Sequence, residues 1–264
     1  MSPPVIHWFR QDLRLADNPA LHAAATQGPV VALYILDEET PGTWKHGGAS
    51  RWWLHKSLEA LSAELERRGN KLVLRRGKAQ SVLHTLIEET GAQAVNWNRQ
   101  YEPWAIARDS TLKDRLKALG VMTESFNGSL LNEPWQVKTG AGGAFKVFTP
   151  FWKSASAAIE ATPPLPVPKS LPPPESFPRS DKLSDWRLLP TRPNWATGFE
   201  PVWTPGEAGA RKRLKTFLDK ALARYADGRD RPDQENTSRL SAHLRFGEIS
   251  PRQVWHAVDL ARRD

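Results

Sequence analysis

Short apolar runs alternate with amphipathic stretches through the first half of the chain. Val5–Phe9 (VIHWF) is β-branched and aromatic, and residues 29–36 (PVVALYIL) are almost continuously apolar, which is typical of strands buried on both faces of a sheet. Similar apolar runs follow at residues 71–75, 94–97 and 121–126. The pattern therefore predicts five strands.

Segments with helical spacing separate these strands. Asn18 and Pro19 are the residue types favoured at the N-cap and at the first position of a helix, and an alanine-rich stretch follows them. Residues 50–68 carry apolar side chains three or four positions apart, and residues 79–90 and 106–119 show the same spacing. The alternation predicts an α/β fold with a doubly wound, five-stranded parallel sheet, in which ligands bind at the carboxyl ends of the strands.

The pattern changes after residue 151. Seven of the residues from 163 to 174 are prolines, which neither continue a helix nor occupy a central strand, so we expect an extended connector. We therefore divide the chain into an α/β domain over residues 1–135, a connector over 136–205 and an incomplete helical unit over 206–264.

Helical spacing resumes in this last part. Apolar residues from Ala210 to Tyr225 share one predicted helical face, and a further helix is expected over residues 251–263. The part is too short to bury a core of its own, so it is either a fragment or packs against something else.

Composition excludes several classes of chemistry. The chain has no cysteine, which excludes disulfides, iron–sulfur clusters and thiol nucleophiles and is compatible with a reducing cytosol. No run approaches the roughly 20 apolar residues of a membrane helix, and the first residues lack the pattern of a signal peptide. No Gly-x-Gly-x-x-Gly fingerprint follows the first predicted strand, and the seven histidines show no metal-ligand spacing. We predict a cytoplasmic monomer without a membrane partner.

The chain is basic and rich in tryptophan. Its formal net charge of +8 favours a polyanionic partner such as nucleic acid, although a general bias towards solubility explains the charge equally well. Each of the twelve tryptophans is expected either in the core or on a stacking surface.

Residues 8–21 (WFRQDLRLADNPAL) follow the first predicted strand. Arg10, Asp12 and Arg14 are charged residues at the position where a ligand crevice would lie. Alternatively, the three side chains pair with one another and fix the turn, and this structural interpretation is favoured.

The same segment closely resembles the opening of the DNA photolyase/cryptochrome family, class I cyclobutane pyrimidine dimer photolyases in particular. Further segments resemble the family in the same order: ASRWWL (49–54), WNRQYE (97–102), KVFTPF (146–151), YADGRD (225–230), NTSRLS (236–241) and FGEISPR (246–252). On these residues the chain is identified as the N-terminal part of a family member, with the antenna domain in residues 1–135 and the start of the helical FAD-binding domain from residue 206.

The resemblance implies a deoxyribodipyrimidine photolyase, a carbon–carbon lyase that uses blue light and electron transfer from reduced FAD to repair cyclobutane pyrimidine dimers in DNA. An antenna chromophore, methenyltetrahydrofolate or 8-hydroxy-5-deazaflavin, would pass energy to the flavin. The alternatives are a cryptochrome-type blue-light photoreceptor and an α/β module that binds a chromophore or a partner on its own. No catalytic acid or base is expected in this chain. Because family members are much longer, we expect a truncated form that binds FAD weakly and is inactive alone.

The resemblance also assigns FAD contacts to six residues, Tyr225, Thr237, Ser238, Arg239, Leu240 and Ser241. Hydroxyls, backbone N–H groups and a guanidinium at a loop that enters a helix suit a diphosphate. The simpler interpretation is a helix cap with a salt-bridged Arg239, and core packing is the simpler role of Tyr225.

Two further residues carry implied roles. Arg229 matches a DNA phosphate contact, although neighbouring aspartates could simply pair with it. Glu102 matches a position that binds a folate antenna and could equally be a surface carboxylate. His46 more plausibly belongs to a turn than to a folate site, and Trp52 and Trp53 are expected in the core rather than on an antenna surface.

Overall fold

A parallel sheet forms the centre of the molecule. The computed structural model describes residues 2–160 and 162–263, and within them five strands pair in the order β3-β2-β1-β4-β5. Every pairing is parallel. The strands are β1 (Val5–Phe9), β2 (Val30–Leu36), β3 (Leu72–Arg76), β4 (Ala94–Asn98) and β5 (Met122–Phe126). The predicted doubly wound five-stranded sheet is confirmed.

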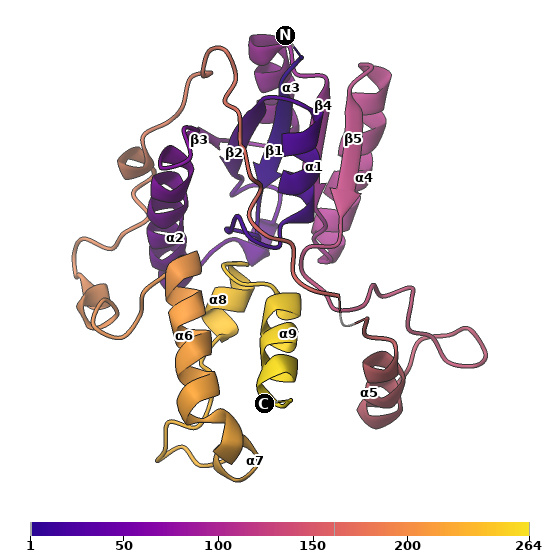
Figure 1. The fold of residues 1–264 in the computed structure, drawn as a ribbon. Helices are drawn as coiled ribbons and strands as arrows, with labels where there is room; N and C mark the ends of the chain where they lie inside the picture. Colours follow the sequence, from indigo (N-terminus) through magenta and orange to yellow (C-terminus); the bar gives the residue numbers. More distant parts are fainter. Residues whose placement is uncertain (1, 161, 264) are drawn as a thin grey trace.

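Helices cover both faces of the sheet (Figure 1). The side chains of Val5 and Phe9 point to one face, in a core shared with α1 (Pro19–Gln27) and α2 (Gly48–Glu66). The side chains of Ile6 and Trp8 point to the other face, in a core shared with α3 (Ala79–Thr90) and α4 (Pro103–Ala118). Side chains of successive strand residues alternate between faces, so one short strand contributes to both cores.

The connector packs against the α/β part of the chain. Its backbone is hydrogen-bonded to the α/β part at three places: Asp17 N to Leu165 O, Val30 N to Pro172 O and Asp181 N to Leu74 O, at 2.8, 2.7 and 2.8 Å. The 3-10 turns η2 (Leu183–Trp186) and η3 (Trp195–Gly198) follow. One helix in this region, α5 (Phe148–Ala157), had no sequence prediction, and it lies to the side of the molecule in Figure 1.

The last part of the chain is helical and packs below the carboxyl ends of the strands (Figure 1). Its elements are α6 (Glu207–Lys220), η4 (Leu222–Arg224), α7 (Tyr225–Gly228), α8 (Ser241–Arg245) and α9 (Pro251–Ala261). The prediction that one helical face continues to Tyr225 is wrong, because α6 ends at Lys220 and Ala221 leaves the helical conformation with φ −120°. Tyr225 instead packs edge-on against Phe217 from the separate helix α7, at 5.7 Å between ring centroids.

The helical part joins the main core, as its small size predicts. Its own apolar cluster has only four buried members, Ala210, Leu214, Leu240 and Ile249. Phe246 is buried in the core of the α/β part, and its carbonyl accepts a hydrogen bond from Leu13 N at 3.1 Å. None of the helices described is long and apolar enough to cross a membrane.

Candidate functional site

Arg14 connects the first β–α turn to the helical part by hydrogen bonds. Its side chain is buried, and its three nitrogens donate to four backbone carbonyls, those of Ala16, Asp17, Gly128 and Gly247, at 2.6–3.1 Å. Gly247 belongs to the loop between α8 and α9, 233 residues further along the chain. Burial lowers the pKa of Arg14, and the nearby Asp12 and Asp17 oppose this shift.

Arg10 reaches in the opposite direction, towards α4. Its guanidinium donates to Asp109 at 2.7 Å and to the Asn98 carbonyl. The Asp12 carboxylate accepts from the Arg10 backbone N–H at 2.6 Å and from Asn98 Nδ2 at 2.5 Å. The predicted Arg–Asp–Arg turn is therefore wrong in its pairing, because neither guanidinium pairs with the Asp12 carboxylate. The structural role itself is confirmed, since Arg14 binds the Ala16 and Asp17 carbonyls within the turn. The other partners of Arg10 and Arg14 lie 88 to 233 residues away, where a local reading could not find them.

A stack of aromatic rings and guanidinium groups lies beside Arg10. The Arg108 guanidinium lies 4.7 Å from the centre of the Trp8 ring and 5.1 Å from that of Trp104, and Arg10 lies 4.9 Å from the same Trp8 ring. Asp109 joins the two cations, accepting from Arg10 with Oδ2 and from Arg108 with Oδ1. Stacking of arginine on tryptophan holds both partners in fixed positions.

This stack lines a narrow cavity at the carboxyl ends of β1, β2 and β4. The cavity has a volume of 70 Å³, and its walls include Trp8, Tyr34, Trp104, Arg108 and Phe246. Sites for small molecules usually measure about 300–1,000 Å³. The position matches the expectation for a doubly wound sheet, but the size does not fit a tricyclic deazaflavin.

The residues proposed for an antenna chromophore lie around this cavity. Glu102 is half-buried at the N-cap of α4 and accepts a hydrogen bond from Gln11 Nε2 at 3.2 Å. His46 lines the cavity and stacks on Phe246 at 5.9 Å, and burial together with Arg245 and Arg51 lowers its pKa. Trp52 and Trp53 are buried in the main core, which confirms their predicted structural role.

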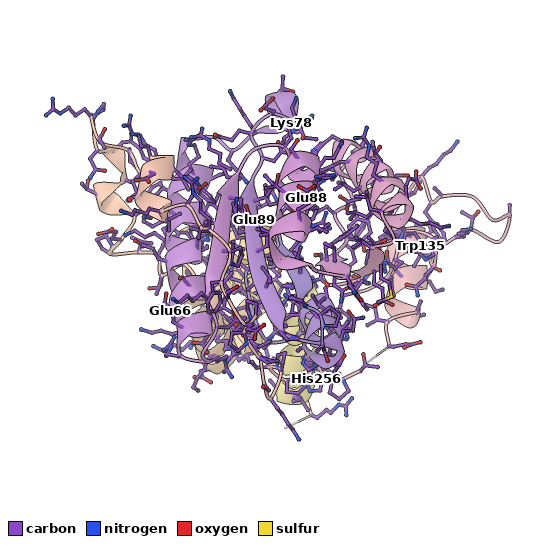
Figure 2. All side chains as sticks on the ribbon, turned by 90° about the horizontal axis from the view of Figure 1, so that it is seen from above. Glu66, Lys78, Glu88, Glu89, Trp135 and His256 are labelled. Carbon is purple, nitrogen blue, oxygen red and sulfur yellow. The ribbon has the colours of Figure 1, made fainter. Side chains whose placement is uncertain are left out.

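The segment after Trp97 is fixed by a second charged group. Glu133 accepts hydrogen bonds from Arg99 at 2.7 Å and from the Tyr101 hydroxyl at 2.9 Å. The Arg99 guanidinium also lies 5.6 Å from the ring of Trp135, which projects at the side of the molecule in Figure 2. These contacts hold the backbone that leads into Glu102.

The loop predicted to meet FAD is exposed and rich in donors. Thr237, Arg239 and Ser241 are exposed, Ser238 is half-buried and Leu240 is buried. Arg239 has φ +52° and pairs with Glu235 at 3.0 Å, and Ser238 Oγ accepts from Leu240 N at 3.4 Å. The simpler salt bridge of Arg239 is therefore present, whereas no side chain caps α8 at Leu240. Thr237, Arg239 and Ser241 still face solvent. That donor set fits a diphosphate.

Tyr225 and Arg229 lie apart from this loop in the chain, on and just after α7. Tyr225 is 41% exposed, so the edge-on contact with Phe217 leaves much of its ring accessible. Arg229 is exposed and pairs with Asp230 at 3.3 Å, while Arg231 pairs with Asp233 at 3.1 Å. Surface ion pairs of this kind are weak and leave an arginine able to bind a phosphate.

Sequence reasoning missed Glu248 as a structural centre. Its carboxylate is completely buried and accepts from Trp53 Nε1 at 3.0 Å, from Gly206 N at 2.7 Å and from Ser57 Oγ. Its second oxygen contacts His243 Nδ1 at 2.5 Å. Only its place within the FGEISPR segment marked it in the sequence. No group of three or more histidine, aspartate or glutamate side chains in residues 2–160 and 162–263 could hold a metal ion.

These features define a class of protein: a doubly wound α/β domain with a helical segment packed at the carboxyl edge of its sheet. The DNA photolyase family model matches residues 5–170, and the chain belongs to that family.

Individual relatives give the same result over nearly the whole chain. The chain is 51% identical over 258 residues to the deoxyribodipyrimidine photo-lyase of Agrobacterium fabrum, covering 97% of this chain and 53% of that protein. It is 37% identical to Cryptochrome-1 of Arabidopsis thaliana, covering 96% of this chain and 37% of that protein. The crystal structure of a bacterial class III photolyase from Agrobacterium tumefaciens superposes with a TM-score of 0.92 at 49% identity, over 97% of this chain and 53% of that one. The chain thus spans about half the length of these photolyases.

Proposed function

We propose that this chain takes part in light-driven repair of cyclobutane pyrimidine dimers in DNA, as the antenna domain and the diphosphate-binding side of a deoxyribodipyrimidine photolyase. The observation that carries the proposal is the 51% identity to a deoxyribodipyrimidine photo-lyase over almost the whole chain. When bound in its reduced form, FAD supplies the light-excited electron donor. The chain's own residues bind and orient this cofactor and the DNA.

Arg239 is the residue best placed to bind the FAD diphosphate. It is exposed and held in a fixed conformation with φ +52°, and Thr237, Ser238 and Ser241 offer hydroxyls beside it. Tyr225 would contact the same cofactor from α7, and Leu240 would support the loop from the core. Binding to the diphosphate side alone is expected to be weak, because phosphate contacts here are exposed to water.

Titration of the purified protein with FAD, followed by quenching of flavin fluorescence, tests this site. Arg239→Ala should weaken binding at least about tenfold, because a charge-assisted hydrogen bond contributes about 1.5–3 kcal/mol. Arg263→Ala is the matched control, since Arg263 also forms an exposed i,i+4 pair, with Asp259. Equal affinities in all three proteins would contradict the assignment.

Arg229 is proposed as a DNA phosphate contact. A phosphate contact carries no sequence information, so Arg229→Ala should weaken binding to all DNA duplexes uniformly. It should also reduce the slope of the logarithm of the binding constant against the logarithm of the salt concentration by about one. Fluorescence anisotropy with dimer-containing and undamaged duplexes at several salt concentrations measures both effects. An unchanged salt slope would exclude the contact.

The proposed antenna chromophore is methenyltetrahydrofolate or 8-hydroxy-5-deazaflavin, and the small cavity at the carboxyl ends of the strands favours the folate. Glu102 can accept hydrogen bonds from the amino and ring N–H groups of a pterin, and a folate would meet it at the start of α4. Glu102→Gln should weaken folate binding in an absorbance titration. Glu88→Gln, at an exposed site on α3, is the control.

A cryptochrome-type photoreceptor is the second candidate, supported by the 37% identity to a plant cryptochrome. Light-dependent loss of dimers, assayed with FAD and damaged DNA in a protein that includes this chain, separates the two functions. Repair supports the lyase, and FAD photoreduction without repair supports the receptor. We further propose that the protein is cytoplasmic and monomeric. Sedimentation equilibrium tests the monomeric state.

A further inference from the structure

The cavity at the sheet edge is already filled by side chains of this protein. An engineered cavity of about 150 Å³ holds a single benzene ring, whereas this one measures 70 Å³. The space above the Trp8 ring is taken by the Arg108 guanidinium at 4.7 Å, and the Trp104 ring lies on the other side of that guanidinium at 5.1 Å. A planar chromophore could stack on Trp8 only by displacing these two side chains.

Two buried donors at the wall of the cavity have no protein acceptor. Trp8 Nε1 and Arg10 Nε find no hydrogen-bond partner among the described residues, and both residues line the cavity. Buried donors are normally paired, so each exception needs an explanation. Once the side chains that cover them are removed, these donors and the Trp8 ring would suit a flat heteroaromatic group with carbonyl acceptors.

The two filling residues are held in place in different ways. Arg108 donates to Asp109 at 2.8 Å and to Gln100 Oε1 at 2.8 Å, and its side chain is 9% exposed. Trp104 is half-buried in the first turn of α4, and no hydrogen bond of its ring nitrogen is found among the described residues. Positions four apart on a helix share a face, so Trp104 covers Arg108. Trp104 is therefore the side chain that can be removed with least damage.

We propose that Trp104, with Arg108 beneath it, determines chromophore specificity by filling the sheet-edge cavity and excluding tricyclic rings of the flavin and deazaflavin type. The inference rests on the antenna role proposed above, and it leaves a folate at Glu102, outside the cavity, as the antenna. Removing the Trp104 ring uncovers the Arg108 guanidinium, which is then free to move off the Trp8 ring and to open the space beside the two unpaired donors.

Riboflavin is the probe, because it has the tricyclic ring and its carbonyls but no diphosphate. Fluorescence titration should show at least tenfold tighter binding to Trp104→Ala than to the unaltered protein, with Trp104→Phe in between. Trp152→Ala is the matched control: Trp152 lies on α5, does not line the cavity and is 43% exposed, so its loss should leave riboflavin affinity unchanged. Circular dichroism of each variant shows that it is folded.

Two results would overturn the inference. One is unaltered protein that binds riboflavin as tightly as Trp104→Ala, and the other is folded Trp104→Ala with no gain. Arg239→Ala in the Trp104→Ala background separates this inference from the proposed FAD site, because riboflavin lacks the diphosphate that Arg239 would bind. A riboflavin gain that persists in the double variant supports the cavity, even if FAD binding at the loop fails.

Discussion

The carboxylate of Glu248 accepts a hydrogen bond from the indole nitrogen of Trp53, 3.0 Å away and 195 residues earlier in the chain. Trp53 lies on α2, whereas Glu248 follows α8. The same carboxylate also accepts from Gly206 N, at the start of α6, and contacts His243 on α8. One buried charge therefore holds three helices in position.

Replacing Glu248 should destabilise the protein strongly. Glu248→Ala leaves several buried polar groups without their acceptor, so we expect the free energy of unfolding to fall by about 3 kcal/mol or more. Glu248→Gln keeps the shape but turns an amide NH₂ towards donors, and its loss should be smaller. Urea denaturation measures both. Glu88→Gln, on the exposed surface labelled in Figure 2, should stay within about 0.5 kcal/mol of the unaltered protein.

Arg14→Lys tests the second charged contact between the two parts of the chain. Lysine keeps the charge but loses the planar fork that reaches four carbonyls at once, so a loss of about 2–4 kcal/mol is expected. Arg67→Lys, at an exposed position at the end of α2, should be nearly neutral. An unchanged free energy of unfolding in Arg14→Lys would show that the carbonyl contacts contribute no stability beyond that of the positive charge.

Gly247 combines a special backbone conformation with a close contact. Its φ is +63°, and a Cβ at this position would lie 2.0 Å from Gln11 O. Gly142→Ala separates the two effects, because Gly142 has φ +79° with nothing within 4 Å. We expect a loss of about 1 kcal/mol for Gly142→Ala and clearly more for Gly247→Ala, as measured by thermal unfolding. Similar losses would mean that the loop around Gly247 moves away freely.

His7 should make stability depend on pH. Its ring is completely buried in β1, and this burial lowers its pKa from 6.5 to about 4, against the opposing effect of Asp12. Between pH 6.5 and 4, His7 is protonated in the unfolded chain but stays neutral in the folded protein. Stability is therefore fully present above pH 6.5 and is lost as the pH falls, by about 3 kcal/mol at pH 4.

Urea denaturation at pH 7.5 and pH 4 measures this loss. His7→Leu should lose less stability than the unaltered protein over this range, because leucine does not titrate. His84→Gln, at an exposed site on α3, is the control and should keep the full pH dependence. Identical pH profiles for His7→Leu and the unaltered protein would exclude His7 as the cause.

The sequence by itself determined the central sheet and the family. Strands such as β2 are apolar at every position because both of their faces are buried, and that composition can be read without a structure. Asn18 marked the start of α1, and its side chain does accept from Leu21 N at 3.1 Å. The roles of the FAD and DNA residues stay predictions, since they came from resemblance and not from local physics.

The tertiary structure alone decided how the charged residues are used and how large the cavity is. Arg10, Arg14 and Glu248 bind partners that are brought together only when the helical part packs on the sheet. The structure also ends α6 at Lys220 and places Tyr225 on a separate helix. Hydrophobic periodicity is a local property, whereas a buried hydrogen bond depends on which distant groups meet, so the sequence pattern could place the strands but not these contacts.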